Sequence, residues 1–225
     1  MEVRSGGDRG QLAMWEAWHG RHVALDDSPL HTACRTELIG ALPPPDVSGP
    51  ILELGSGQGY DAIAIAENGY QVEALEFSEA AITIARRNLS CHHGLHVSFA
   101  RRNISFPLPY ADSYFSGIYS YLALHYFDLK VTKEVFSEIA RVAKRECAFS
   151  FAVRSIEDPL FGKGEKIGTH FYDLNGHVRH FFDVNEVAGL LQGSWVIHDL
   201  RASRDYYLSR SQKLGGIIKG MAIRI

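Results

Sequence analysis

The sequence has few of the residues that hold disulfide-rich or zinc-dependent proteins together. It contains three cysteines, Cys34, Cys91 and Cys147, which lie far apart and form no CxxC pair. An odd number of cysteines without paired spacing indicates neither a disulfide framework nor a zinc site, and it fits a reducing compartment. We therefore expect a cytoplasmic protein.

Long apolar runs and an excess of one charge are also missing. No stretch approaches the roughly 18 apolar residues of a membrane span, and the opening residues MEVRSGGDRGQ lack the apolar core of a signal peptide. The net charge is −3, without a lysine or arginine tract. Such a chain is poorly suited to binding nucleic-acid phosphates. We expect neither a membrane nor a nucleic acid as partner.

What the chain does have is an ordinary globular composition, with 46% hydrophobic and 22% charged residues. A chain of 225 residues is expected to bury one core. Residues 11–225 are therefore predicted to form a single domain after a flexible tail of residues 1–10. Within it, residues 11–45 are predicted to form a helical arm. Residues 154–182 are predicted to form a lid-like insert, because a loop of that length in a compact domain usually covers a site.

Short β-rich runs alternate with helical patterns through the middle of the chain. The predicted buried strands are ILEL (51–54), QVEAL (71–75), HVSFA (96–100), FSGIYSYL (115–122) and CAFSFAV (147–153). Helices are predicted between them over DAIAIAEN, EAAITIARRNL and KEVFSEIARVAK, with a later short helix over DVNEVAGLLQ. This alternation indicates a parallel sheet with right-handed crossovers.

Two last runs, SWVIHDL and GIIKGMAIRI, are predicted to complete the sheet as an antiparallel hairpin. The expected fold is therefore α/β: a Rossmann-like, doubly wound sheet of seven mostly parallel strands with an antiparallel C-terminal hairpin.

The first predicted strand leads into a glycine loop, ELGSGQG, residues 53–59. A P-loop is excluded because it requires GxxxxGK, and no lysine stands near this loop. The dinucleotide fingerprint requires glycines at positions 1, 3 and 6, whereas Gly55, Gly57 and Gly59 fall at 1, 3 and 5. Alternate glycines at the end of a strand let the backbone approach a ligand closely. The pattern favours a nucleoside ligand that carries no phosphate.

The loop begins with an acid, Glu53, and continues through a spacer into GxGxG; a second acid, Glu76, stands at the end of the second strand. This pattern resembles the first motifs of the class I S-adenosylmethionine-dependent methyltransferases. The resemblance extends from about Gln11 to the C-terminus in the order of the predicted elements. It implies S-adenosyl-L-methionine as cofactor. Glu53 would then meet the ammonium of the methionine part, directly or through water, and Glu76 would accept both ribose hydroxyls.

The resemblance also implies a larger set of cofactor contacts, with Phe77 against the face of the adenine. The residues expected to bind the cofactor are Trp15, Glu53, Gly55, Ser56, Gly57, Gly59, Asp61, Glu76, Phe77, Asn103, Ile104 and Tyr121.

Two positions depart from the family pattern. Members commonly place an aspartate after the third strand to hold the adenine amino group, and this chain has Asn103, whose amide oxygen can still accept that hydrogen bond. Lys144, Arg145 and Glu146 replace the proline and glycine turn that usually precedes the fifth strand. A cofactor-binding protein without turnover therefore stays open as an alternative.

The acceptor side of the site offers weaker signals. His125 follows the fourth strand and is the best single base, because histidine exchanges a proton near neutral pH; a packing role on the core is an equal alternative. His180 is the second catalytic candidate. The segment WEAWHGRHVALDDSP resembles the arm of thiopurine and thiol methyltransferases, in which tryptophans fold over the cofactor. Its alternative interpretation is the apolar stripe of an amphipathic helix.

The residues expected to bind substrate are Trp18, Tyr126, Arg154, His177 and Arg179, with the arginines facing an anionic group. His177, His180 and Asp183 have ligand-like spacing, but they straddle a helix start and offer no fourth partner, so no metal is predicted. The resemblance implies methyl transfer to a thiol, hydroxyl or amine of a small molecule, by a monomer or homodimer. A nicotinamide-dependent oxidoreductase is the alternative enzyme, and the glycine spacing argues against it.

Overall fold

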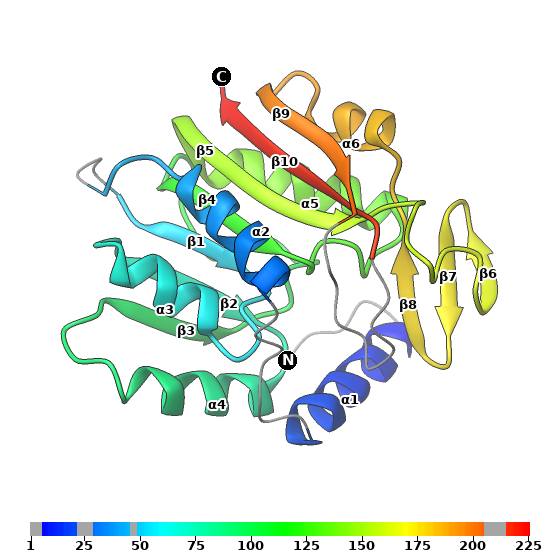
Figure 1. The fold of residues 1–225 in the computed structure, drawn as a ribbon, viewed down its shortest axis with the longest axis horizontal. Coiled ribbons are helices and arrows are strands. Elements are labelled where there is room, and N and C mark those ends of the chain that lie inside the picture. Colours follow the sequence, from blue (N-terminus) through cyan, green and yellow to red (C-terminus); the bar gives the residue numbers. More distant parts are fainter. Residues whose placement is uncertain (1–5, 22–28, 46–48, 205–214) are drawn as a thin grey trace.

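The computed structural model describes residues 6–21, 29–45, 49–204 and 215–225. Its centre is a seven-stranded sheet in the order β3-β2-β1-β4-β5-β10-β9 (Figure 1). The strands are β1 (Ile51–Leu54), β2 (Val72–Glu76), β3 (Val97–Arg101), β4 (Phe115–Tyr121), β5 (Ala143–Arg154), β9 (Trp195–Ser203) and β10 (Ile217–Arg224). β1 to β5 pair in parallel, and β10 pairs antiparallel with β5 and β9. The predicted fold class is confirmed.

Helices cover both faces of this sheet. They are α1 (Gly6–Arg21), α2 (Pro29–Gly40), α3 (Tyr60–Glu67), α4 (Glu79–Leu89), α5 (Leu129–Val142) and α6 (Val184–Leu191). Apolar side chains of α2, α3 and α4 form one core against the sheet, and those of α5 and α6 form another. None of the helices in the described ranges combines the length and the apolar character needed to cross a bilayer.

Local signals explain where α4 and α5 begin. The Ser78 hydroxyl accepts a hydrogen bond from the backbone N–H of Ala81 at 3.1 Å, so α4 begins where its N-cap predicts. α5 begins at Leu129, four residues before the predicted start, because the carboxylate of Asp128 caps it through the N–H of Val131 at 2.8 Å. Residues 144–146, which replace the usual proline and glycine turn, form no turn: α5 ends at Val142, β5 begins at Ala143, and Glu146, at φ +66°, lies inside that strand.

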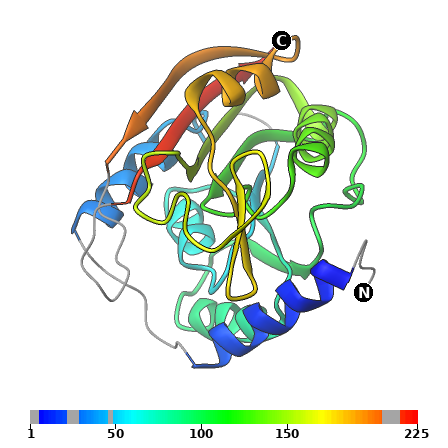
Figure 2. The same cartoon turned by 90° about the vertical axis from the view of Figure 1, so that its right-hand side faces the viewer.

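The predicted insert is folded rather than irregular. It contains β6 (Glu165–Gly168), β7 (Phe171–Leu174) and β8 (His177–His180), which form a separate antiparallel sheet in the order β6-β7-β8 (Figures 1 and 2). Asn175 and Gly176, both at positive φ, connect β7 to β8. Asn-Gly is a strong hairpin signal, and it identifies this turn in the sequence.

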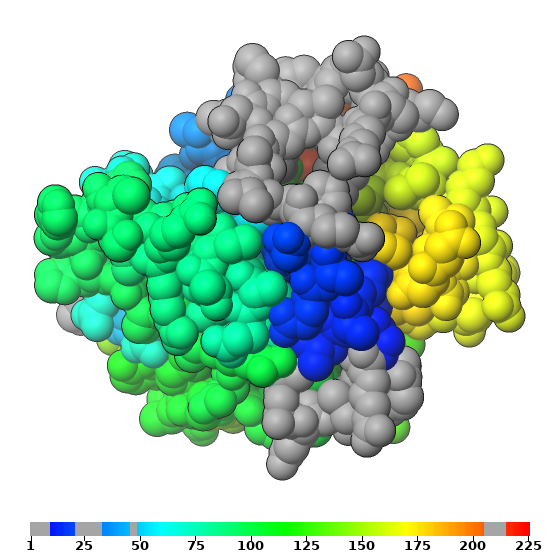
Figure 3. Space-filling model, turned by 90° about the horizontal axis from the view of Figure 1, so that it is seen from below, coloured from blue at the N-terminus to red at the C-terminus, as the bar shows by residue number. Residues whose placement is uncertain are grey.

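α1, the first helix of the arm, crosses the carboxyl edge of the sheet. Figure 3 shows α1 lying between α4 on one side and the insert on the other. Residues 6–10, predicted to belong to a flexible tail, are the first part of α1, while residues 1–5 lie outside the described part of the chain. The described portions of the predicted helical arm, 11–21 and 29–45, contain the rest of α1 and the whole of α2.

Candidate functional site

The glycine loop connects β1 to α3, and its three glycines have different surroundings. All three lie at positive φ. A Cβ atom on Gly55 would overlap that of Ala123, and one on Gly59 would lie 2.7 Å from the Phe99 ring and 2.8 Å from Ala85 Cβ. A Cβ on Gly57 would meet only the ring of His19, at 3.7 Å. Two glycines therefore permit close packing within the protein, and Gly57 alone faces open space.

Glu76, at the end of β2, holds this loop in place. Its Oε1 accepts hydrogen bonds from the backbone N–H groups of Phe77 at 2.7 Å and Ser78 at 2.8 Å, and its Oε2 accepts one from Gly57 at 2.8 Å. A carboxylate has about four acceptor positions, so one position remains, on Oε2. The sequence predicts contacts with two ribose hydroxyls, and the observed geometry has room for one.

Glu53, at the end of β1, is buried without a matching cation. It is 2% exposed, and its Oε2 has no hydrogen-bond partner among the described residues. Burial, together with the nearby carboxylate of Asp61, raises the pKa of Glu53 well above its usual range, while Arg35 opposes the shift. A ligand ammonium would supply the missing positive charge, so this position fits the amino-acid end of a nucleoside cofactor.

Asp61 takes part in a buried network beside Glu53. Both Nε and Nη2 of Arg35, on α2, bind Oδ1 of Asp61, and the Tyr119 hydroxyl donates to its Oδ2 at 3.2 Å. Asp61 was expected to bind the cofactor, and the structure places it behind the glycine loop, engaged by protein groups. Arg35 thereby ties α2 to the first turn of α3.

A cavity of about 200 Å³ lies in front of the loop, at the carboxyl end of the parallel strands. Several residues that the sequence predicts for the site line it: Trp15, Gly55, Gly57, Glu76, Phe77, Asn103, Ile104 and Tyr126. It is also lined by residues that sequence reasoning missed, namely Gln11, His19, Leu75, Arg102, Leu122, Ala123 and Phe127. A cavity at this edge of an α/β sheet is where such folds bind their ligands.

The arm forms one wall of the cavity. The Trp15 ring meets the edge of Tyr126 with centroids 5.1 Å apart, and it lies 6.3 Å from His177. Neither side-chain N nor O of Gln11 has a hydrogen-bond partner among the described residues, although both are buried. No motif marks Gln11, because its role depends on where α1 crosses the sheet. Trp18 packs on Trp15 but is 38% exposed and does not line the cavity.

Asn103 lies in the cavity wall after β3 and is partly engaged by the protein. Its Oδ1 accepts a hydrogen bond from the backbone N–H of Ser105 at 3.0 Å. The second lone pair of Oδ1 and the amide NH₂ are the groups left to meet an adenine edge.

Other predicted cofactor residues lie behind the wall. Glu53, Ser56, Gly59, Asp61 and Tyr121 are absent from the lining of the cavity. The Ser56 hydroxyl is buried and has no hydrogen-bond partner in the described ranges. Tyr121 packs against the core beneath α2, α3 and α4, where burial and then the neighbouring Cys34 raise the pKa of its hydroxyl.

His125 lies behind Tyr126, with ring centroids 4.2 Å apart, and is fully buried. Neither of its ring nitrogens has a hydrogen-bond partner in the described part of the chain. Burial, followed by the positive charges of Arg154 and Arg179, lowers the pKa of His125 well below its usual range. The imidazole is therefore neutral at physiological pH, and it does not reach the cavity wall in this arrangement.

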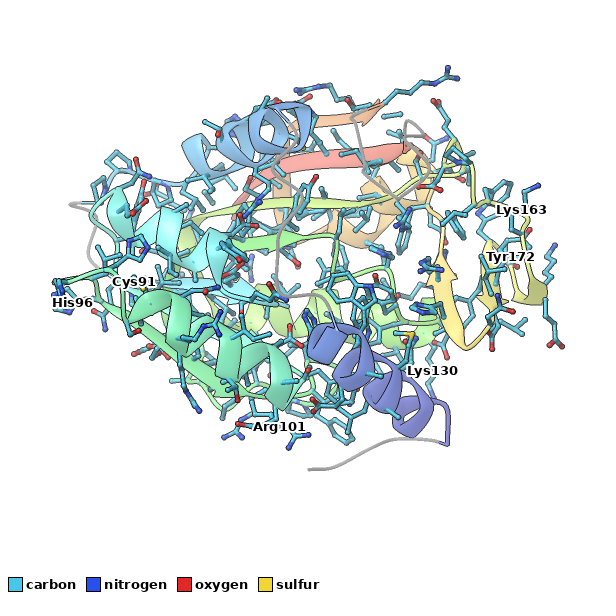
Figure 4. The ribbon with its side chains drawn as sticks, turned by 60° about the horizontal axis from the view of Figure 1, so that its bottom comes forward. Cys91, His96, Arg101, Lys130, Lys163 and Tyr172 are labelled. Atoms are coloured by element: carbon cyan, nitrogen blue, oxygen red, sulfur yellow. The ribbon has the colours of Figure 1, made fainter. Side chains whose placement is uncertain are left out.

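The substrate residues expected from the insert are spread over two places. Arg154 is 2% exposed, and its Nη1 pairs with Oδ2 of Asp158 at 2.5 Å. Arg179 Nη2 lies 3.3 Å from His177 Nδ1, close to Trp15 and the cavity. His180 points elsewhere: its Nε2 lies 2.9 Å from Oε1 of Glu186. Lys163 and Tyr172 lie at the outer end of the insert (Figure 4).

Comparison with known proteins agrees with this geometry. Residues 51–146 match a family model described as "Methyltransferase domain". Among solved structures, the chain is similar to a S-adenosylmethionine-dependent methyltransferase from Mesorhizobium loti, with a TM-score of 0.66, 19% identity, and 87% of this chain and 100% of that chain covered. No curated protein sequence matches significantly.

Two further solved structures have the same fold. Geranyl diphosphate C-methyltransferase from Streptomyces coelicolor A3(2), in complex with Mg²⁺, geranyl diphosphate and S-adenosyl-L-homocysteine, has a TM-score of 0.66 and 16% identity, with 86% of this chain and 78% of that chain covered. A putative methyltransferase from Haloferax volcanii, in complex with the Trm112 activator, has a TM-score of 0.71 and 16% identity, with 94% and 96% covered.

At identities this low, structural similarity shows the fold alone. The family match covers β1 to β4, the glycine loop and the two acids Glu53 and Glu76. Residues 51–146 therefore match a methyltransferase domain, and the chain as a whole has the fold of the S-adenosylmethionine-dependent methyltransferases.

Proposed function

We propose that this enzyme methylates a thiol, hydroxyl or amine of a small molecule in the cytoplasm, as a monomer or homodimer. The observation that carries the proposal is the position of α1, which closes the cavity over the glycine loop with Trp15. A macromolecular acceptor would have to approach through this arm, whereas a small one fits beneath it. The family match favours methyl transfer over the nicotinamide-dependent alternative.

Two structural neighbours support a small acceptor. One acts on geranyl diphosphate, and another belongs to echinomycin biosynthesis, where a disulfide bond is converted into a thioacetal group. The cavity of this chain is walled mainly by apolar and aromatic residues, among them Trp15, Tyr126 and Phe127. Such walls suit an apolar or aromatic acceptor body with few polar groups.

When bound, S-adenosyl-L-methionine supplies an activated methyl group on a sulfonium. The chain's own residues bind and orient it. Glu53 lies behind the cavity wall and would meet the ammonium through water with its unpartnered Oε2, and Glu76 offers the remaining position on its Oε2 to a ribose hydroxyl. Asn103 and Phe77, both in the cavity wall, receive the adenine. Gly57 leaves the space through which the backbone meets the ligand.

On the acceptor side, alignment and exclusion of water account for most of the rate enhancement, because the methyl group arrives activated. Trp15 and Tyr126 exclude water, and His177 with Arg179 stands at the edge nearest to them. An acceptor that arrives protonated needs a base. His125 is neutral and serves if Tyr126 moves aside. His180, the second candidate from the sequence, is held by Glu186 away from the cavity and is not proposed as the base. Trp18 and Arg154 complete the proposed substrate set.

The test is calorimetric binding of S-adenosylhomocysteine, followed by transfer of a labelled methyl group to a panel of small thiols, hydroxyls and amines. We expect Gly57→Val to lose binding, since its side chain enters the ligand space. Gly189→Val, on α6 with open space around it, should bind as the wild type does. Failure of the wild type to bind would overturn the cofactor site. Binding without transfer to any acceptor class would favour the non-catalytic alternative.

A further inference from the structure

A second cluster of ligating side chains lies between the insert and α6, outside the cofactor cavity. His170 comes from the turn between β6 and β7, His180 from the end of β8, and Glu186 from the first turn of α6. One ligand atom from each lies within 4.8 Å of the other two. β8 leads directly into α6 (Figure 2), so the cluster joins the small sheet to the main domain.

Two buried atoms of this cluster face each other without a hydrogen bond. His170 Nδ1 and Glu186 Oε2 are 3.5 Å apart, and neither has a hydrogen-bond partner among the described residues. The third member is close by, with His180 Nε2 at 2.9 Å from Glu186 Oε1. A His–Glu hydrogen bond accounts for that last contact but leaves the first two atoms unsatisfied, which is costly for buried polar groups.

The spacing suits a cation shared by all three side chains. A tetrahedral Zn²⁺ with bonds of about 2.0–2.2 Å places neighbouring ligand atoms roughly 3.3–3.5 Å apart. The His170 Nδ1–Glu186 Oε2 separation of 3.5 Å falls in this range, the His180 Nε2–Glu186 Oε1 separation of 2.9 Å is shorter, and one ligand atom from each residue lies within 4.8 Å of the other two. One ion would satisfy the orphaned nitrogen and the orphaned oxygen at once.

The side chains are also held in position. His170 has φ +53°, and its carbonyl accepts a hydrogen bond from the N–H of Phe181 at 2.8 Å, which fixes this strained turn. His180 is fully buried and stacks on Phe182 with centroids 4.1 Å apart.

We propose that His170, His180 and Glu186 bind a divalent first-row transition-metal ion, with Zn²⁺ the expected species and water in the remaining coordination positions. Two imidazoles and one carboxylate form a donor set typical of zinc and related ions. The ion fastens the β6–β8 sheet to α6 and so sets the position of the insert over the domain.

This site differs from the set of His177, His180 and Asp183, whose spacing in the sequence resembles that of metal ligands. Asp183 is occupied as the N-cap of α6, since its side chain accepts from the N–H of Glu186 at 2.8 Å, and His177 faces Trp15. The ligands are instead His180, His170 from the turn before β7, and Glu186, which stands three residues after Asp183. Only the folding of the insert brings His170 beside them.

The test titrates chelator-treated, full-length protein with ZnCl₂ by calorimetry and counts bound metal by mass spectrometry. We expect one ion per chain. His170→Ala and Glu186→Gln should each weaken binding by at least about 100-fold, because loss of a direct ligand exceeds the 10- to 100-fold effect of an outer-shell partner. His198→Ala, an exposed histidine on β9, is the matched control and should bind as the wild type does.

Two results would overturn the proposal: wild-type protein that binds no stoichiometric metal, or His170→Ala protein that binds as tightly as His198→Ala. His170 is only partly buried, so its variant is expected to fold. A second readout is the visible spectrum of bound Co²⁺, which reports imidazole and carboxylate ligation. It should be present in the wild type and lost in His170→Ala, whether or not the protein transfers methyl groups.

Discussion

Glu53 has surroundings that folding alone does not explain. It is buried with an unpartnered oxygen, close to a second carboxylate, and its pKa is raised. Its charge is therefore a cost to the empty protein and an advantage only when a cation arrives. Stability and ligand binding make opposite demands on this position.

We expect Glu53→Gln to be more stable than the wild type at pH 8 and to bind S-adenosylhomocysteine more weakly. The folded protein holds the Glu53 proton above the ordinary glutamate pKa, so stability falls as pH rises through the raised pKa. The gain in free energy of unfolding should be largest at pH 8 and should shrink towards pH 5. Urea unfolding and calorimetry measure the two effects. Loss of both stability and binding would mean that Glu53 is a purely structural residue.

Cofactor binding should also depend on pH through the same carboxyl group. An ammonium beside Glu53 favours its ionised form, so binding releases a proton wherever the empty protein holds one. The affinity for S-adenosylhomocysteine should therefore rise with pH until the raised pKa of Glu53 is passed. This holds below the pH at which the ligand ammonium loses its proton. Calorimetry in two buffers of different ionisation enthalpy measures the released proton. Glu53→Gln lacks the carboxyl group, so it should release no proton on binding and serves as the control.

The glycines of the loop should separate folding from binding. Gly59→Ala meets Phe99 and Ala85 and should lose about 2–4 kcal/mol of stability, combining positive-φ strain with overpacking. Gly57→Ala carries only the strain, about 1–2 kcal/mol, but should weaken S-adenosylhomocysteine binding more. Urea unfolding and calorimetry on both variants provide the comparison. Equal effects on stability would contradict the surroundings described for Gly57.

At the scale of elements, α1 is fastened to the N-terminus of α4 by one side chain. The carboxylate of Glu16 accepts hydrogen bonds from the Ser78 hydroxyl at 3.0 Å and from the N–H groups of Glu79 at 2.8 Å and Ala80 at 2.9 Å. Arg101 pairs with the same carboxylate at 3.3 Å, on the side of the molecule shown in Figure 4. A carboxylate at a helix N-terminus is well placed to bind its unpaired N–H groups.

We expect Glu16→Ala to release α1 and so to raise the Kd for S-adenosylhomocysteine by about tenfold, the value of one charge-assisted hydrogen bond. Hydrogen exchange in α1 should quicken, because its attachment to α4 is lost. Glu67→Ala, an exposed position at the end of α3, serves as control. Faster exchange with unchanged Kd would show that the arm covers the cavity without contributing to cofactor binding.

At the scale of the whole molecule, the cofactor site gathers the ends of β1 and β2, the loop after β3, α1 and the segment around Tyr126. A ligand that contacts all of them should stabilise the domain as a unit. At 100 times its Kd, S-adenosylhomocysteine should raise the free energy of unfolding by about 2.7 kcal/mol. For a protein of this size, that corresponds to a Tm increase of about 5–10 °C. Thermal unfolding with NADH should show no shift; the reverse pattern would favour the oxidoreductase alternative.

The central elements could be predicted because their signals are local. Buried strands read as apolar β-branched runs, Ser78 marks the start of α4, and the spacing of Gly55, Gly57 and Gly59 excludes two other ligand loops. The acids Glu53 and Glu76 could be found from their place at the ends of adjacent strands. The small sheet of the insert was missed, although Asn175 and Gly176 mark its turn.

The sequence by itself determined the succession of strands and helices along the chain, the glycine loop and the expected cofactor, since each depends on neighbours within about ten residues. Tertiary structure decided which side chains meet. It placed Glu16 on the end of α4, Arg35 on Asp61, and His170 beside Glu186. These contacts join residues that are separated in the chain. A local sequence pattern cannot predict which of them meet after folding.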